Sequence, residues 1–222
     1  MSARDLRRID RIERYSPGVR IVHWIVAVSF VLLALSGLAL FHPAMFWLTN
    51  LFGGGPWTRI LHPFIGCFLV VVFAKLGAQF WRDNLMQQRD WEWLRKSGDE
   101  IRNREENLPE VGRYNAGQKL LFFTLVGCLV CLLLSGIPIW RAYFSAYFSV
   151  RLVRLGALSH AFFAFVMICA IIVHIYAAIW VKGSVRAMTR GWVTPGWAWK
   201  HHRAWFRDVT KAAAALRGAP PK

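Results

Sequence analysis

The sequence lacks charged residues over four long stretches, and this lack excludes an ordinary soluble domain. Of its 222 residues, 56% are apolar and only 18% are charged. Three ranges contain no Asp, Glu, Lys or Arg: residues 21–41, 120–140 and 155–181. A fourth, residues 60–80, contains one such residue, Lys75. Because about 20 apolar residues in a helix cross the hydrocarbon core of a bilayer, the sequence predicts an all-α membrane protein with four spans at these ranges.

Cysteine is also scarce, which excludes iron–sulfur clusters from this chain. The four cysteines all lie inside the predicted spans: Cys67, Cys128, Cys131 and Cys169. Clusters are held by sets of closely spaced cysteine thiolates, and no second pair accompanies Cys128 and Cys131. We interpret Cys128 and Cys131 as packing residues, because free cysteine behaves as a small buried apolar side chain.

Acidic residues are outnumbered, 12 against 28 Lys and Arg, and the basic excess alternates along the chain. Three segments carry six, eight and nine basic residues: residues 1–20, 81–119 and 182–222. The other two connections, residues 42–59 and 141–154, carry one and three and are too short for a catalytic domain. Since basic segments stay in the cytoplasm, we expect both termini and the long loop there. The charge then favours anionic lipid headgroups, and we expect no nucleic-acid partner.

Four histidines lie in the spans or at their edges, where an ionisable side chain is unfavourable and is therefore a functional candidate. Counted along the alternating spans, His62 and His160 lie near the outer face, and His23 and His174 lie near the cytoplasmic face. The 14 residues from His160 to His174 correspond to about 21 Å of helix and nearly four full turns. The fourth span therefore supplies one ligand to each of two stacked sites, and the first and second spans supply the opposite ligands.

Two histidines at each level suit haem better than zinc. A haem needs one axial ligand on each face, whereas a zinc site uses three or four protein ligands. Gly37 lies at the depth of the outer site and Gly66 lies one turn from His62, where glycine would let a flat macrocycle approach; simple helix packing is the alternative. The sequence thus predicts a four-helix transmembrane bundle that binds two stacked haems.

Other interpretations stay open at this point. Each histidine could be an ordinary hydrogen-bonded core residue, the set could line a proton or ion channel, or the chain could be a structural membrane anchor. His42 is expected at the outer interface, and His201 and His202 are expected in solvent or against a partner. Within the long loop, residues 90–103 are expected to contain a short interfacial helix.

Seven stretches of the sequence point to a known family when taken together. They are Arg20–Trp24, Arg59–Gly66 (RILHPFIG), Val111–Lys119 (VGRYNAGQK), Ile139–Phe148 (IWRAYFSAYF), Ser159–Ala161, His174–Ser184 (HIYAAIWVKGS) and Trp199–Trp205 (WKHHRAW). Over about residues 10 to 207, the chain resembles the cytochrome b (gamma) subunits of respiratory, membrane-bound formate dehydrogenases.

The resemblance implies two b-type haems with bis-histidine ligation. The outer haem would be held by His62 and His160, and the inner haem by His23 and His174. His42 departs from the family, where an apolar residue is expected, and adds a further ligand candidate near the outer haem. Cationic partners for the haem propionates are only weakly indicated, at Arg59 and Arg141.

The resemblance also implies a quinone site beside the inner haem. Its candidate residues are Asn115, Gly117 and Gln118, and its ligand would be menaquinone or ubiquinone. Amide side chains can hydrogen-bond quinone carbonyls. The alternative for Asn115 is that it only caps the third span.

The function implied is electron transfer within a larger complex. A catalytic molybdenum or tungsten (alpha) subunit would oxidise formate at the outer side, and an iron–sulfur (beta) subunit would pass electrons through the two haems to quinone reduced at the cytoplasmic side. We therefore expect one membrane domain, residues 1–222, in the bacterial inner membrane, without formate-oxidising activity of its own. Cytochrome b subunits of nickel–iron hydrogenases and thiosulfate reductases are the alternative within the same class.

Overall fold

The computed structural model describes residues 10–98 and 109–218. Contacts divide the chain into two compact units, which are described separately. We call one the membrane unit, made of Ile21–Gln79 and Phe123–Tyr176. The other, the polar unit, is made of Met1–Arg20, Phe80–Phe122 and Ala177–Lys222.

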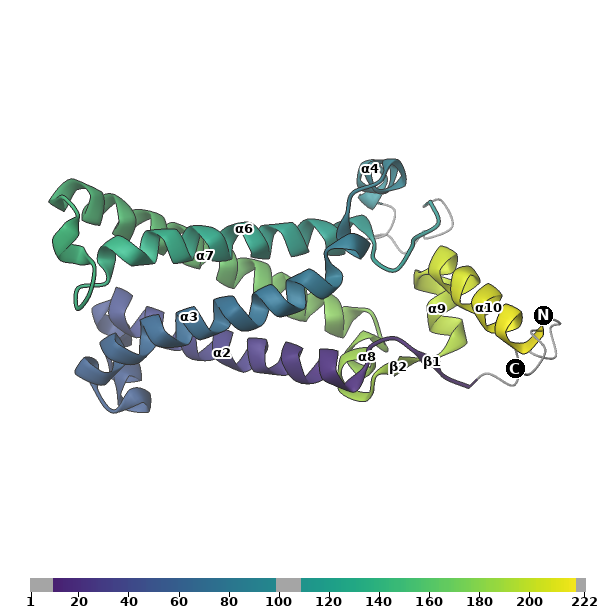
Figure 1. The fold of residues 1–222 in the computed structure, drawn as a ribbon, viewed down its shortest axis with the longest axis horizontal. Coiled ribbons are helices and arrows are strands. Elements are labelled where there is room, and N and C mark those ends of the chain that lie inside the picture. Colours follow the sequence, from purple (N-terminus) through teal and green to yellow (C-terminus); the bar gives the residue numbers. More distant parts are fainter. Residues whose placement is uncertain (1–9, 99–108, 219–222) are drawn as a thin grey trace. The chain divides into compact units, whose positions relative to one another are not determined.

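Four helices are long and apolar enough to cross a membrane (Figure 1). They are α2 (Pro17–Phe41), α3 (Gly55–Phe80), α6 (Ala116–Ile139) and α7 (Val150–Trp180). The all-α prediction and the four predicted spans are confirmed. Each helix begins a few residues before its predicted span because its first turn holds proline or polar residues, which a search for apolar runs leaves out. Pro17 opens α2 at a position where a missing N–H breaks no helical hydrogen bond.

The core of the membrane unit draws on all four helices. Its buried centre consists of Leu69 of α3, Cys128 and Leu129 of α6, and Met167 of α7, with α2 side chains packed against them. Burial of Cys128 agrees with the packing interpretation of that cysteine. Most other apolar side chains are exposed: only 6% of the most apolar window of α7 is buried, as expected for a surface that meets lipid.

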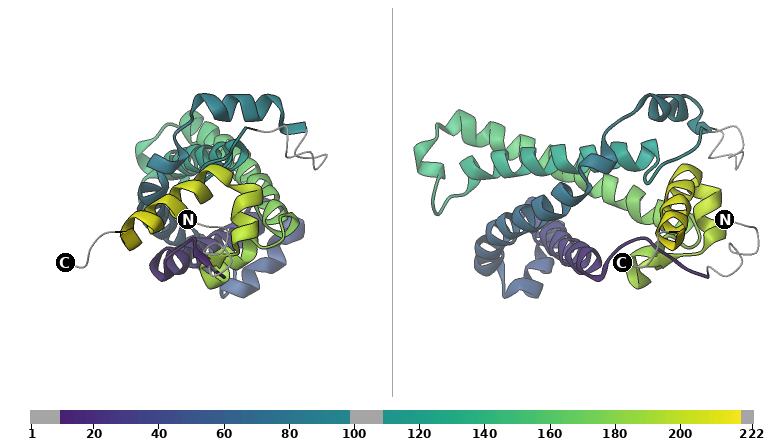
Figure 2. Two further views of the ribbon diagram at one scale, coloured as in Figure 1. Left: turned by 90° about the vertical axis from the view of Figure 1, so that its right-hand side faces the viewer. Right: turned by 45° about the vertical axis from the view of Figure 1, so that its right-hand side comes forward.

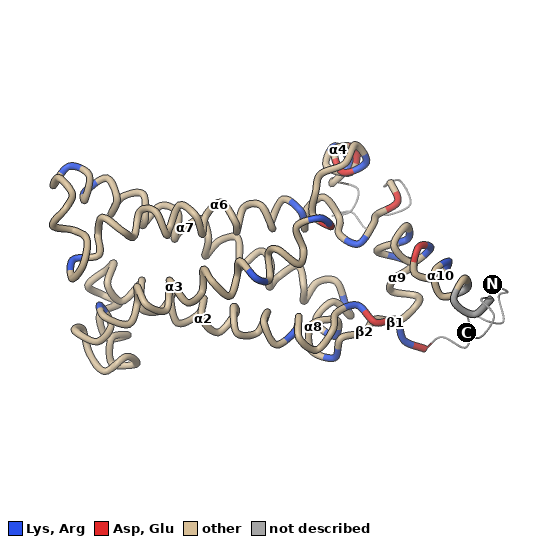
Figure 3. Tube along the Cα trace, viewed as in Figure 1, with Lys and Arg blue, Asp and Glu red and all other residues tan. Residues whose placement is uncertain are grey.

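Charge is sparse in the membrane unit and has one sign. Ile21–Gln79 and Phe123–Tyr176 contain no Asp or Glu at all. Figure 3 shows most Lys and Arg residues of these helices near the helix ends. By sequence position, Lys75 lies inside α3. Two further views of the helices are given in Figure 2.

Short 3₁₀ helices follow α2 and α6. The first, η1 (Pro43–Phe52), begins at His42, whose Nδ1 accepts a hydrogen bond from the Ala44 N–H at 3.2 Å, and ends at Gly53 with φ 84°. The second, η4 (Ser145–Tyr147), precedes α7, whose first turn is capped by the Ser149 hydroxyl.

The polar unit gathers segments that are distant in sequence. Its elements are β1 (Ile12–Glu13), η2 (Arg82–Asn84), α4 (Gln88–Arg95), α8 (Ser184–Arg190), β2 (Trp192–Val193), α9 (Pro195–His201) and α10 (Arg203–Gly218). β1 pairs antiparallel with β2, Ile12 opposite Val193. Both residues lie in an apolar core completed by Ala187, Ala198, Trp205 and Phe206. The helix expected within residues 90–103 is α4, which begins and ends earlier; residues 99–108 lie outside the described part.

Candidate functional site

Two histidines of the membrane unit, His62 of α3 and His160 of α7, face each other; we call them the outer pair after their predicted depth. Their ring centroids are 6.2 Å apart and the ring planes are inclined by 68°. The helices that carry them are held by the shared apolar core between all four helices. The structure thus brings together two residues that are 98 positions apart in the sequence.

A second pair, His23 of α2 and His174 of α7, has nearly the same spacing; we call it the inner pair. The ring centroids are 6.3 Å apart and the planes are inclined by 53°. The Nδ1 atom of His23 is buried and has no hydrogen-bond partner among the described residues. α7 therefore contributes one ring to each pair, as the spacing along this helix predicts.

The outer pair is supported by a Ser-Gly sequence on each neighbouring helix. Ser36 of α2 lies 2.7 Å from His62 Nδ1, and Ser135 of α6 lies 3.1 Å from His160 Nδ1. A Cβ atom added to the following glycine, Gly37, would lie 3.4 Å from the Cε1 atom of its histidine. The matching distance from Gly136 to the other ring is 3.5 Å. Each imidazole ring therefore lies against one serine hydroxyl and one glycine of a neighbouring helix. These two contacts fix the orientation of the ring.

Both pairs fit an iron porphyrin and fit zinc poorly. Two metal–nitrogen bonds of about 2 Å in line, together with the radii of two imidazoles, place the ring centres roughly 6 Å apart. The described residues include no group of three or more His, Cys, Asp or Glu that could hold a metal ion. A porphyrin supplies the four other nitrogens itself, so two histidines complete the coordination. At the outer pair, the serine contacts at Nδ1 leave Nε2 as the nitrogen available to a metal.

In the polar unit, Asn115 and Gln118 form a reciprocal cap at the start of α6. The Asn115 side-chain oxygen accepts the Gln118 N–H at 2.8 Å, and the Gln118 side-chain oxygen accepts the Asn115 N–H at 3.0 Å. Gly117 lies against Trp93, whose ring would be 3.4 Å from an added Cβ. The side-chain oxygen of Asn115 therefore caps α6, as the alternative interpretation of this residue predicts. Since both caps use carbonyl oxygens, the two NH₂ groups remain the donors of these side chains.

Comparison with known proteins places this geometry in a family. The model of the prokaryotic cytochrome b561 family matches residues 14–191. The chain is 43% identical over 206 residues to the cytochrome b556(fdo) subunit of formate dehydrogenase from Escherichia coli (strain K12), covering 93% of this chain and 97% of the relative. It is 39% identical to the formate dehydrogenase cytochrome b556 subunit of Haemophilus influenzae, with 94% and 87% covered. The nitrate-inducible cytochrome b556(Fdn) subunit of E. coli is 40% identical, with 88% and 90% covered.

The chain belongs to the family of formate dehydrogenase cytochrome b556 subunits. The resemblance drawn from the seven sequence stretches is confirmed. Membership of a cytochrome b family favours the haem interpretation of the histidines over a histidine-lined channel or a structural anchor.

The three histidines outside the pairs of this cytochrome b serve local structure. His42 caps η1, and no contact with the outer pair is present among the described residues. His202 is 2% exposed, and its Nδ1 lies 2.9 Å from the Gly112 carbonyl oxygen. Burial, together with the nearby Arg14 cation, lowers the pKa of His202 to about 3. The expectation of a solvated His202 is wrong, because the N-terminal segment and the tail share one core. His201 stacks on Trp197, with ring centroids 5.4 Å apart.

Sequence reasoning missed Ser36, Ser135 and Gly136 of this cytochrome b. Ser-Gly occurs in both the first and the third span, but this pattern does not by itself indicate contact with a histidine. Of the two glycines that were predicted, Gly37 contacts the His62 ring, whereas an added Cβ at Gly66 would meet Leu33 at 3.8 Å. Gly66 thus fits the helix-packing alternative.

Proposed function

We propose that this chain is a dihaem membrane subunit that carries electrons across the bilayer from partner subunits to quinone. The observation that carries the proposal is the presence of two histidine pairs with ring spacings of 6.2 and 6.3 Å, joined by one helix. His62 and His160 would hold the outer haem b, and His23 and His174 the inner one. Each haem, when bound, supplies a reversible one-electron carrier.

The remaining work of the chain is to hold and orient its ligands. α7 spaces the two sites, since 14 residues of helix correspond to about 21 Å along the helix axis. The hydroxyl and glycine contacts keep the outer rings in one orientation. The membrane unit contains no Asp or Glu that could pair with the exposed side chains of Arg59 and Arg141. Within that unit, these cations would therefore be available to the anionic haem propionates.

Within the polar unit, Asn115 and Gln118 would bind quinone. A quinone carbonyl is an acceptor, and the side-chain NH₂ groups of these residues are donors. The carbonyl oxygens that cap α6 hold both amides in place at the same time. Gly117 would allow a flat ring to lie close to the first turn of the helix. Menaquinone and ubiquinone both present such carbonyls.

The partners proposed are the iron–sulfur (beta) and formate-oxidising (alpha) subunits of a formate dehydrogenase. The names of the relatives support this assignment. The protein would lie in a bacterial inner membrane with both termini on the cytoplasmic side. Electrons would then move from the outer side of the membrane to the cytoplasmic side. That movement stores about 2.3 kcal/mol for each charge and each 100 mV of membrane potential.

Alanine substitution of each ligand tests the pairing. In reduced-minus-oxidised spectra of the purified complex, we expect His62→Ala and His160→Ala to lose the same haem. His23→Ala and His174→Ala should lose the other one. His42→Ala is the matched control, because this histidine lies outside the pairs, and it should retain both haems. Loss of different haems in His62→Ala and His160→Ala would contradict the proposed ligand set.

A further inference from the structure

We infer that Ser36 and Ser135 are positioning residues that lower the midpoint potential of the outer haem. The inference rests on the proposed function, since it assigns these hydroxyls to the ligands of that haem. Ser36 is fully buried and Ser135 is 9% exposed, so bulk water competes little for either hydroxyl.

The direction of each serine–histidine hydrogen bond follows from where the hydroxyl proton goes. A serine hydroxyl has one proton to donate and two lone pairs that accept. Ser36 donates to the Leu33 carbonyl oxygen at 3.2 Å, and this bond uses its only proton. We assign the 2.7 Å contact with His62 to Nδ1–H as the donor and the hydroxyl oxygen as the acceptor, which leaves the hydroxyl proton on the Leu33 carbonyl.

The same argument holds on the other side of the site. Ser135 donates to the Cys131 carbonyl oxygen at 2.6 Å, with the Leu132 carbonyl at 3.3 Å as a second acceptor. We assign its 3.1 Å contact with His160 in the same way, with the imidazole Nδ1–H as donor. In this arrangement, both outer histidines keep Nε2 unprotonated for iron.

The two contacts occur at equivalent places in two helical hairpins. Ser36 of α2 reaches His62 of α3, and Ser135 of α6 reaches His160 of α7. The sequence separations are 26 and 25 residues. Each hairpin therefore delivers one ligand together with the hydroxyl that orients it, and the outer site closes when the two hairpins pack.

Donation from Nδ1–H to an oxygen makes an axial imidazole more basic. A more basic ligand stabilises ferric over ferrous iron and lowers the midpoint potential. In the inner pair, His23 differs from both outer histidines, because its Nδ1 is buried without a hydrogen-bond partner among the described residues. The serines therefore bias electrons away from the outer haem and toward the inner one, which is the direction of quinone reduction.

Potentiometric titration of the complex tests the inference. We expect Ser36→Ala and Ser135→Ala each to raise one of the two haem midpoint potentials, and the double variant to raise it further, while the other haem stays unchanged. The g values of the same ferric low-spin haem should shift in electron paramagnetic resonance, because the axial ligand field changes. Ser29→Ala is the control: Ser29 is also buried in α2, and the described structure gives it no contact with a histidine.

A hydroxyl-retaining variant separates ligand positioning from packing. Ser135→Thr should keep the native potential. If Ser135→Ala loses the outer haem while Ser135→Thr retains it, the hydroxyl is needed to hold the ligand and the inference stands. Loss in both variants, or two bound haems with unchanged midpoints in both alanine variants, would overturn it. Absence of haem from the unmodified complex would instead refute the proposed function itself.

Discussion

Asn115 and Gln118 use different atoms of the same side chains for structure and for proposed ligand binding. Their oxygens cap α6, at 2.8 and 3.0 Å from backbone N–H groups. Their NH₂ groups are the donors that a quinone carbonyl requires. Sequence reasoning set capping against quinone binding, but the geometry makes the two roles compatible.

This division of atoms predicts the effect of nearly isosteric substitutions. Asn115→Asp and Gln118→Glu keep the capping oxygen, and Asp is as good a cap as Asn, so α6 should remain intact. Both variants replace a donor with an anionic acceptor, so we expect formate:quinone activity of the complex to fall about tenfold or more, equivalent to roughly 1.4 kcal/mol of lost interaction. Haem spectra should remain native. Activity equal to that of the unmodified complex in both variants would exclude these amides from the quinone site.

The paired histidines and the serines that contact them differ in how well the sequence predicts their roles. His23, His62, His160 and His174 stand out because an ionisable side chain in an apolar span needs a reason. Serine is common in membrane helices, so Ser36 and Ser135 carry no such signal alone. Their role depends on which helices are neighbours, which the sequence pattern does not specify.

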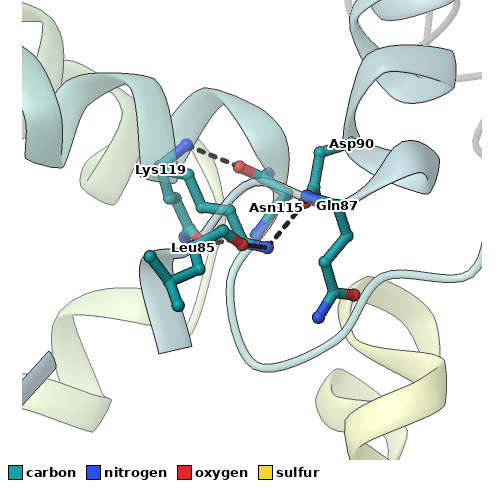
Figure 4. A network of polar contacts seen from close by, with 6 residues as sticks. Leu85, Gln87, Asp90, Asn115 and Lys119 are labelled. Atoms are coloured by element: carbon teal, nitrogen blue, oxygen red, sulfur yellow. Dashed lines mark hydrogen bonds and ion pairs between the residues drawn. The ribbon is translucent and has the colours of Figure 1, made fainter. Parts of the chain in front are cut away.

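At the scale of the secondary-structure elements, a buried ion pair joins α4 to α6. Lys119 donates to the Asp90 carboxylate at 2.7 Å and to the Leu85 carbonyl oxygen at 2.9 Å (Figure 4). The same carboxylate accepts the Gln87 N–H at 2.7 Å, which caps α4. The two side chains are only 4% and 6% exposed. The pair therefore links the first turn of α6, next to Gln118, to the start of α4.

Removing one member of this ion pair should lower the stability of the protein more than removing both. We expect Lys119→Met to destabilise the protein by about 3–5 kcal/mol, because it leaves a buried carboxylate without its cation. The double variant Lys119→Met/Asp90→Asn should recover part of that loss. Thermal unfolding of the detergent-solubilised protein measures both changes.

An exposed pair of the same unit provides the control. Arg207 and Glu110 lie 2.9 Å apart but are 49% and 40% exposed, so Glu110→Gln should change stability by about 1 kcal/mol or less. Equal effects of Lys119→Met and Glu110→Gln would show that the buried pair has no special role.

Helix positions were predictable from hydropathy, whereas the packing of the polar unit was not. The four spans follow from charge-free length alone, and only their first turns were missed. In contrast, Ile12 and Val193 pair across 181 residues through a two-residue ladder that leaves no periodic signal. The core around Trp205 and Phe206 likewise depends on contacts between the two ends of the chain.

At the scale of the whole molecule, one helix contributes a histidine to both pairs. α7 carries His160 and His174, and α2 and α3 each complete one pair. The absence of carboxylates from the membrane unit and the basic residues at its helix ends agree with a cation-rich surface for anionic propionates and lipid headgroups. Whether the two compact units form one domain, as expected from the sequence, stays a prediction.

The most direct measurement is the ratio of haem b to polypeptide in the purified complex. A pyridine haemochrome spectrum combined with quantitative amino-acid analysis gives this ratio. We expect two haems b for each copy of this chain, one for each histidine pair. A ratio of one or zero in the intact, active complex would contradict it.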